Sequence, residues 1–176
     1  MDRWNIFDGG VFVPAAIPVS LAAGAVTGPW MPMRDLSRLY FVLVAGAGTA
    51  TEDPVLTFEQ AQDDSGTGVK ALKIGRVITR IGADIESYDP TEFVRNQDGV
   101  DRKNKVSTFD TADTVTSAGV ADAAGDLEKV IVVEVLDQDM DGDNDFTHVR
   151  CKIAATDNAQ LATLLYIADN RQYISG

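Results

Sequence analysis

KVIVVEVLDQDMDGDNDFTHVRCKI, residues 129–153, holds two apolar stretches separated by a run of Asp and Gly. Residues 129–136 and 146–153 are rich in β-branched side chains, and the second stretch alternates apolar with polar residues, as expected of strands that bury one face. Asp and Gly dominate turns because they tolerate the backbone conformations that turns require. The segment therefore predicts two strands joined by a polar turn.

Further stretches carry the same strand signals, bounded by Gly, Pro and Asp: residues 11–21, 37–45, 54–61, 73–81 and 161–167. Residues 158–169 also suit a helix, with Asp157 as N-cap, but Tyr166 and Ile167 favour a strand over residues 163–168. Short strands separated by turns of Gly, Asp and Thr predict a mainly β fold, a two-sheet β-sandwich or jelly-roll-like domain with a long inserted loop.

The domain organisation follows from length and apolar content. With 176 residues, 45% of them hydrophobic, the chain is long enough for one substantial core. We expect an N-terminal arm over residues 1–12 and a single β-sandwich domain over residues 13–176. Residues 84–125 interrupt the strand pattern, because they are polar and contain Pro90, and are expected to be an insertion.

The net charge of −12 argues against direct binding to nucleic acid, because a polyanion would be repelled. No apolar run approaches the roughly 18 residues needed to span a membrane, so we expect a soluble chain with no export signal. The single cysteine, Cys151, lies in a predicted strand, where a small buried side chain is the ordinary role.

The acidic turn raises the question of a metal. Asp137, Asp139, Asp141 and Asp143 stand at alternate positions with Gly142 among them, which resembles the first half of a calcium-binding loop. The twelfth position is occupied by His148, where that motif requires Glu, and the flanks are predicted strands instead of helices. Two interpretations stay open, a polar hairpin turn with no cofactor or a weak Ca²⁺ site.

Two groups of residues are candidate interface elements. Trp4, Ile6 and Phe7 form an apolar cluster near the N-terminus, which either folds back on the core or docks on a partner. The expected insertion gathers basic side chains on an acidic chain, and these either balance nearby Asp residues or reach an acidic neighbour; they are Arg95, Arg102, Lys103 and Lys105.

Catalytic signatures are scarce. The one histidine, His148, lies in a predicted strand, and no serine or cysteine nucleophile can be paired with it by spacing. Residues 46–48 read Gly-Ala-Gly, but no third glycine and no helix follow as a dinucleotide site requires. We therefore expect a chain that is not an enzyme.

AGAGTATEDPVLTFEQAQDDSGTGVKALKI, residues 45–74, resembles a stretch of the decoration or cement proteins of tailed bacteriophages. Residues 18–21, 30–38, 129–153 and 160–173 extend the resemblance, while residues 84–125 lie outside it. The resemblance implies a virion structural protein, encoded near the major capsid protein, that binds between capsomers and stabilises the capsid. It further implies a homo-oligomer, a trimer, made in the host cytoplasm and located on the capsid surface, with no catalytic residues.

Two alternatives to this function stay open. The first is a neck or tail accessory protein of the phage particle, since such proteins are also small β domains. The second is a calcium-dependent carbohydrate-binding sandwich, in which Trp30, Tyr40 or Tyr88 would stack on a sugar and the acidic turn would hold the metal.

Overall fold

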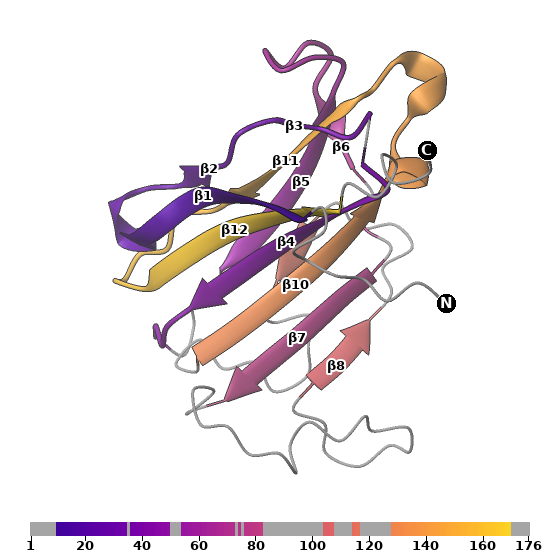
Figure 1. Cartoon of the computed structure of the whole chain (residues 1–176). Coiled ribbons are helices and arrows are strands. Elements are labelled where there is room, and N and C mark those ends of the chain that lie inside the picture. Colours follow the sequence, from indigo (N-terminus) through magenta and orange to yellow (C-terminus); the bar gives the residue numbers. More distant parts are fainter. Residues whose placement is uncertain are drawn as a thin grey trace.

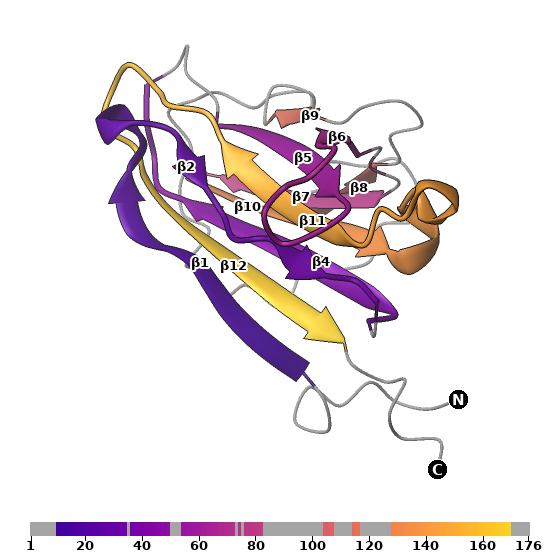
Figure 2. The ribbon, with the colours of Figure 1, turned by 90° about the horizontal axis from the view of Figure 1, so that it is seen from above.

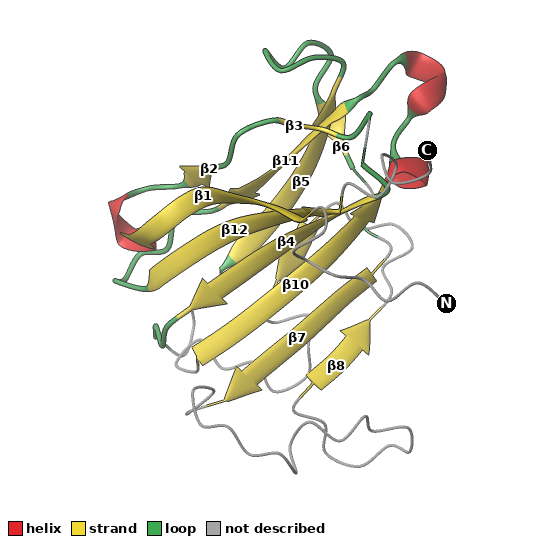
Figure 3. Cartoon of the chain, viewed as in Figure 1, coloured by secondary structure: helices red, strands yellow, loops and turns green. Residues whose placement is uncertain are grey.

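The computed structural model describes residues 10–34, 36–49, 54–72, 74, 76–82, 104–107, 114–116 and 128–169. These residues form a mainly β fold of two antiparallel sheets, with helical structure limited to short 3-10 turns (Figures 1 and 3). Within this part of the chain, no helix has the length and apolar content to cross a membrane.

The first sheet, sheet A, has six strands. In spatial order they are β1 (Gly10–Ser20), β12 (Leu161–Asp169), β4 (Arg38–Ala45), β10 (Glu128–Leu136), β7 (Arg76–Gly82) and β8 (Asn104–Ser107). The strands β12, β4 and β10 form the middle of this sheet, and β4 pairs with both neighbours along its whole length.

The second sheet, sheet B, lies behind sheet A in Figure 1, and in Figure 2 its strands are drawn partly over those of sheet A. Its main order is β2 (Val26–Thr27), β11 (His148–Ile153), β5 (Val55–Ala61) and β6 (Lys70–Ala71). Two short strands join it, β3 (Met31–Pro32) beside β11 and β9 (Thr114–Thr116) beside β5. The 3-10 turns are η2 (Leu21–Ala23), η4 (Asp137–Asp139) and η5 (Gly142–Asn144).

Every strand predicted from the sequence is present, as β1, β4, β5, β7, β10, β11 and β12, with ends that differ by up to three residues. The helical alternative for residues 158–169 is excluded, because β12 occupies that stretch. The short strands β2, β3, β6, β8 and β9 were not predicted. Two of these, β8 and β9, lie in the expected insertion and pair with β7 and β5, so this stretch contributes to both sheets.

The core lies between the two sheets, because each central strand points alternate side chains inward. Phe41 of β4 stands at its centre, with its ring edge-on to Phe58 of sheet B at a centroid distance of 5.2 Å. The ring of Tyr166 on β12 packs against Phe41 at 4.6 Å. All three side chains are fully buried, so aromatic contacts join the two layers.

A hydrogen bond also joins the sheets. Beside β11, the strand pairing is interrupted between β2 and β3, and Cys151 N–H faces this gap. The hydroxyl of Tyr166 crosses the core and accepts that N–H at 3.0 Å, so the buried donor is satisfied. Gly28 lies in the same gap, where an added Cβ would stand 1.9 Å from the Tyr166 hydroxyl. The close approach therefore requires glycine.

Candidate protein-docking face

The outer face of sheet A is apolar at its centre. Side chains on β4 and β12 that alternate with the buried positions point away from the core and are only partly covered. Cross-strand pairs place them in rows, since Ile167 lies opposite Tyr40, Leu165 opposite Val42 and Thr163 opposite Val44. Directly opposite residues of an antiparallel pair share a face, so these side chains form one continuous surface.

The flanking strands widen this surface. On β1, Phe12 lies opposite Ile167 and Pro14 opposite Leu165. On β10, Val132 lies opposite Val42 and Val130 opposite Val44. We call this surface the apolar face of sheet A; its members are Phe12, Pro14, Tyr40, Val42, Val44, Val130, Val132, Leu161, Leu165 and Ile167.

Several of these side chains are open to solvent. Leu161 is 63% exposed, Phe12 50% and Val44 45%. Leu161 is open because its neighbour on the β4 side, Gly46, has no side chain and only donates its N–H to the Leu161 carbonyl at 2.9 Å. Contiguous exposed apolar surface of this kind marks sites of contact with another macromolecule.

Among the described residues, β1 forms one edge of sheet A, and this edge is blunted. Strand β1 pairs with β12 on one side, and its pairing is interrupted by register shifts between Pro14 and Ala16 and between Ala16 and Val19. Pro14 and Pro18 lack the N–H that an added strand would need. Bulges and prolines protect edges from further strand addition. The apolar face, and not the strand edge, is therefore the candidate contact surface.

Charge on this face gathers at one end. Arg38 on β4 bonds Glu134 on β10 at 3.2 Å and lies 3.6 Å from Asp169 on β12. The exposed Asp137 follows directly after β10, and Asp139 accepts the N–H of Leu136 at 2.9 Å. This end of the face therefore holds charges of both signs, and Arg76 on β7 lies opposite Glu134 in the register.

The outer face of sheet B has the opposite character. Glu59 on β5 bonds Arg150 at 2.7 Å and Lys152 at 2.8 Å, both on β11. Burial alone would raise the pKa of the Glu59 carboxyl, but the hydrogen bonds from Lys152 and Arg150 outweigh it, so the pKa lies below its usual value. Arg150 also stacks on the ring of Trp30, 4.1 Å from its centroid. Charged groups on this face are therefore paired within the chain.

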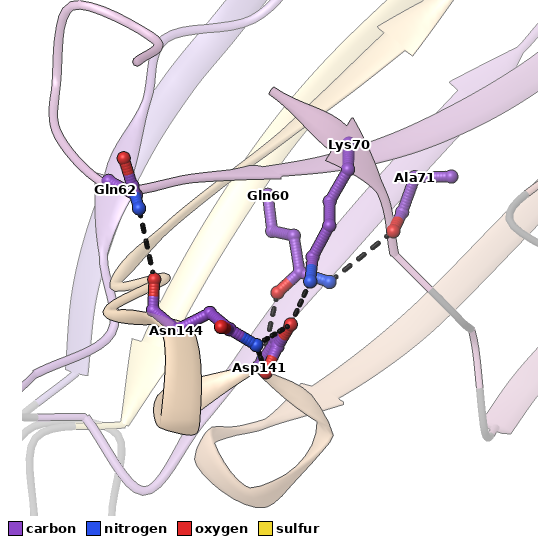
Figure 4. A network of polar contacts seen from close by, with 6 residues as sticks. All are labelled: Gln60, Gln62, Lys70, Ala71, Asp141 and Asn144. Atoms are coloured by element: carbon purple, nitrogen blue, oxygen red, sulfur yellow. Dashed lines mark hydrogen bonds and ion pairs between the residues drawn. The ribbon is translucent and has the colours of Figure 1, made fainter. Parts of the chain in front are cut away.

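The acidic turn is tied to sheet B by a polar network (Figure 4). The ammonium of Lys70 pairs with the Asp141 carboxylate, and the amide of Asn144 donates to both oxygens of that carboxylate at 2.9 Å. Gln60 accepts the Asp141 N–H at 2.9 Å. Hydrogen bonds from Lys70 and Asn144 lower the pKa of the Asp141 carboxyl. Lys70 also lies 4.0 Å from the centroid of the Phe146 ring.

This network bears on the predicted calcium site. Among the described residues, no group of three or more His, Cys, Asp or Glu side chains is arranged to hold a metal ion. Asp139 bonds the backbone of Leu136 and Asp141 bonds Lys70, so these carboxylates face different partners. Asp137 and Asp143 lie in the turns η4 and η5. The turn is held instead by the ammonium of Lys70 and the side-chain amides of Asn144 and Gln60, which all bond Asp141.

The other predicted interface residues lie mostly outside the described part of the chain. Trp4, Ile6 and Phe7 precede it, and Arg95, Arg102 and Lys103 fall in the undescribed stretch before β8. Lys105 belongs to β8, where the structure describes the backbone alone. These residues stay sequence-based predictions.

The residues considered for chemistry are held by structural contacts. His148 begins β11, and its ring Nδ1 lies 2.9 Å from the Thr147 hydroxyl. Cys151 is buried as predicted, and burial raises the pKa of its thiol. Of the aromatic residues considered for sugar stacking, Trp30 lies over Arg150 on sheet B and Tyr40 is on the outer face of sheet A, so they do not form one platform. Tyr88 lies outside the described residues.

Sequence reasoning missed the apolar face, although a signal was present. The segments RLYFVLVA of β4 and LATLLYIAD of β12 are apolar at nearly every position instead of every second one. Such runs are typical of strands that are covered on both faces. In this chain, the described residues of sheet B cover only the inner face of β4 and β12.

Comparison with known proteins gave no match: no family model, no curated protein and no solved structure is significantly similar to this chain.

Proposed function

We propose that this chain is a structural protein of a virus particle, which decorates and stabilises the capsid of a tailed bacteriophage by binding the major capsid protein. The observation that carries the proposal is the contrast between its outer faces. The apolar face of sheet A exposes Phe12, Val44 and Leu161, whereas the outer face of sheet B keeps its charges paired around Glu59.

A protein with one apolar and one ionic face suits a position on a shell. Its apolar face loses contact with water when it is covered by another polypeptide, which is favourable by about 25 cal/mol per Å². Its ionic face needs no partner, because Arg150 and Lys152 already bond Glu59, and it suits exposure to solvent. Many copies on a repeating lattice add the contribution of each contact.

Two further observations support a structural role. The ring of the one histidine contacts the Thr147 hydroxyl, and the one thiol is buried in the core. The two groups are therefore not arranged as a catalytic nucleophile with its base. The resemblance of residues 45–74 to phage decoration proteins favours the capsid surface over other positions. It also favours a trimer, which stays a proposal.

The test is binding to DNA-free heads of the phage whose genome encodes the chain. The purified protein is mixed with heads, the heads are sedimented, and the bound amount is compared with the major capsid protein on a stained gel. We expect saturable binding with a copy number close to that of the capsid subunit. Binding in only a few copies per particle would assign the chain to the neck or tail instead.

Paired variants identify the face that binds. Val42→Glu places a carboxylate in the middle of the apolar face, and we expect it to abolish binding to heads. Thr57→Glu places the same carboxylate on the outer face of sheet B, and we expect it to bind as the unmodified chain does. Equal binding by both variants would contradict the proposed role of the apolar face.

A further inference from the structure

We propose that residues 3–7 fold back along β1 about a tight turn at residues 8–9 and add one strand to sheet A. In this hairpin Trp4 and Ile6 cover the inner side of β1, whereas Phe7 joins the apolar face of sheet A. The role of Phe7 rests on the proposed function, because it enlarges the surface through which the chain is proposed to bind a capsid.

The sequence before β1 carries a strong signal for a hairpin. Residues 1–9 lie outside the described part of the chain and read MDRWNIFDG, so an Asp-Gly pair stands directly before Gly10, the first residue of β1. Asp-Gly between two apolar runs favours a two-residue turn of type I′, whose central residues take positive φ angles. The runs are WNIF before the pair and GVFV after it. A segment that precedes β1 through such a turn lies along the same strand.

The described part of β1 offers backbone groups for this pairing. Among the described strands, β1 pairs only with β12, in continuous register from Gly10 to Pro14. Proline stands on an edge strand with its nitrogen towards the free side, because it has no N–H to donate to a neighbour. Backbone N–H and C=O groups alternate in direction along a strand. Those of Phe12 and Gly10 therefore point towards the free side as well.

The turn and the edge agree on one pairing. In a two-residue hairpin, the residues that flank the turn exchange both of their backbone hydrogen bonds, so Phe7 pairs with Gly10. That pairing needs the N–H and C=O of Gly10 on the free side, where the alternation places them. Asn5 then pairs with Phe12. The added strand ends opposite Pro14, which lacks an N–H and is followed by irregular pairing with β12.

Cross-strand pairs decide which side of the sheet each residue joins, because directly opposite residues share a face. Val11 lies opposite the buried Ala168, so it points to the inner side of sheet A, yet its side chain is 46% exposed. Ile6 pairs with Val11, and Trp4 pairs with Val13. Both residues therefore cover apolar surface at the margin of the core, and removing that surface from water stabilises the hairpin.

Phe7 falls on the other side of the sheet. Its partner Gly10 lies opposite Asp169, which lies opposite Arg38 on the outer side of β4. Phe7 therefore stands on the same side as the half-exposed Phe12, at the margin of the apolar face of sheet A. Because Gly10 has no side chain, the ring of Phe7 has room over it. Of the three apolar residues predicted for the interface, Phe7 alone is assigned to docking.

Engineered disulfides in the full chain test the pairing. Ile6→Cys with Val11→Cys places two thiols opposite each other, with about 4.5 Å between Cα atoms, a separation that a disulfide allows. Phe7→Cys with Val11→Cys is the matched control, because its thiols point to opposite sides of the sheet. We expect the first pair to close roughly ten times faster under mild oxidation, measured by intact mass after alkylation. Equal rates would overturn the hairpin.

Amide hydrogen exchange tests the backbone bonds of the same hairpin. We expect the N–H of Phe12 to be protected along with that of Val13, which faces β12. Gly9→Val puts a β-branched side chain where φ is positive, and should speed exchange at Phe12 by roughly tenfold and leave Val13 unchanged. Gly142→Val, where an added Cβ meets no atom within 4 Å, is the control. Fast exchange at Phe12 in the unmodified chain would contradict the added strand.

Binding to DNA-free heads separates the two roles. Phe7→Ala should weaken binding by roughly tenfold, whereas Ile6→Ala should leave it within about twofold and instead speed exchange at the Phe12 N–H. Unchanged binding by Phe7→Ala, or an equal loss in both variants, would overturn the assignment of Phe7 to docking. A chain that does not bind heads at all rejects the proposed function and with it the role of Phe7, while the disulfide and exchange results still decide the hairpin.

Discussion

The outer faces of the two sheets are built on the same backbone and carry opposite chemistry. In sheet A the outward positions of β4 and β12 are Tyr, Val, Leu and Ile with one Thr, and charge stands at the ends, whereas in sheet B those of β5 and β11 are mainly Thr, Glu, Arg, Lys and His, with Val55 at the start of β5. The core requires only the inward positions, so each outer face is free to take a separate role. An ion-paired face is stable in water, whereas an apolar face is stabilised only when another surface covers it.

The largest effect on stability should come from the core that lies between the two sheets. Phe41→Ala removes a buried ring that packs on both Phe58 and Tyr166, and we expect a loss of about 3–5 kcal/mol in the free energy of unfolding. Urea denaturation measures it. Val42→Ala on the same strand is the control, because Val42 points outward, and its loss should be far smaller. Equal losses would mean that the two residues are buried alike, contrary to the fold.

A smaller effect is expected at the polar bond between the sheets. Tyr166→Phe leaves the buried Cys151 N–H without its acceptor and should cost about 1–3 kcal/mol. Gly28→Ala should destabilise the unmodified chain strongly, because the added Cβ would clash with the Tyr166 hydroxyl. In the Tyr166→Phe background the 1.9 Å contact with the hydroxyl is gone and the nearest atom is the ring Cζ at 2.8 Å, so Gly28→Ala should cost less there. Additive losses in the double variant would contradict the described contact.

The ionic face of sheet B predicts a pH effect. The folded-state pKa of Glu59 lies below its usual 4.5, so the ion pairs stabilise the fold above pH 4.5, and this contribution is lost as the pH falls through the folded-state value. Glu59→Gln should lower stability by about 1 kcal/mol at pH 7. The difference between the two chains should shrink in acid. A difference in melting temperature that does not change with pH would refute the ion-pair account.

The smallest effect concerns the acidic turn. Lys70→Met removes the ammonium that pairs with Asp141 and leaves that carboxylate available to a cation. We expect calcium titration calorimetry to give more heat with the variant than with the unmodified chain, and the fold to stay intact. Stronger calcium binding by the unmodified chain would support a calcium site at Asp137, Asp139, Asp141 and Asp143.

The sequence predicted the strands that are long enough to show alternation. Within the part of the chain that the structure describes, every strand of six or more residues was predicted, whereas β2, β3, β6, β8 and β9 have two to four residues and each pairs with a longer neighbour. Two residues are too few to show an alternation of apolar and polar side chains. Whether such a short segment becomes a strand therefore depends on its pairing with a neighbouring strand.

The candidate site was harder to predict, because it depends on which strands become neighbours. Tyr40 and Ile167 are 127 positions apart in sequence and lie opposite each other only once β4 pairs with β12. The pairing of Asp141 with Lys70 likewise requires the turn after β10 to meet β6. Sequence spacing left two interpretations of that turn open, a polar hairpin turn or a weak Ca²⁺ site, and could not show that the fold places an ammonium from a distant strand beside it.

The most direct measurement of the central claim is hydroxyl-radical footprinting of the chain, free and assembled on its particle, read out by mass spectrometry. We predict strong protection of Phe12, Tyr40 and Leu165 on sheet A in the assembled state, with Trp30 on sheet B as reactive as in the free chain. Protection of Trp30 combined with unchanged reactivity at Tyr40 would show that the chain docks through its ionic face, and would contradict the account.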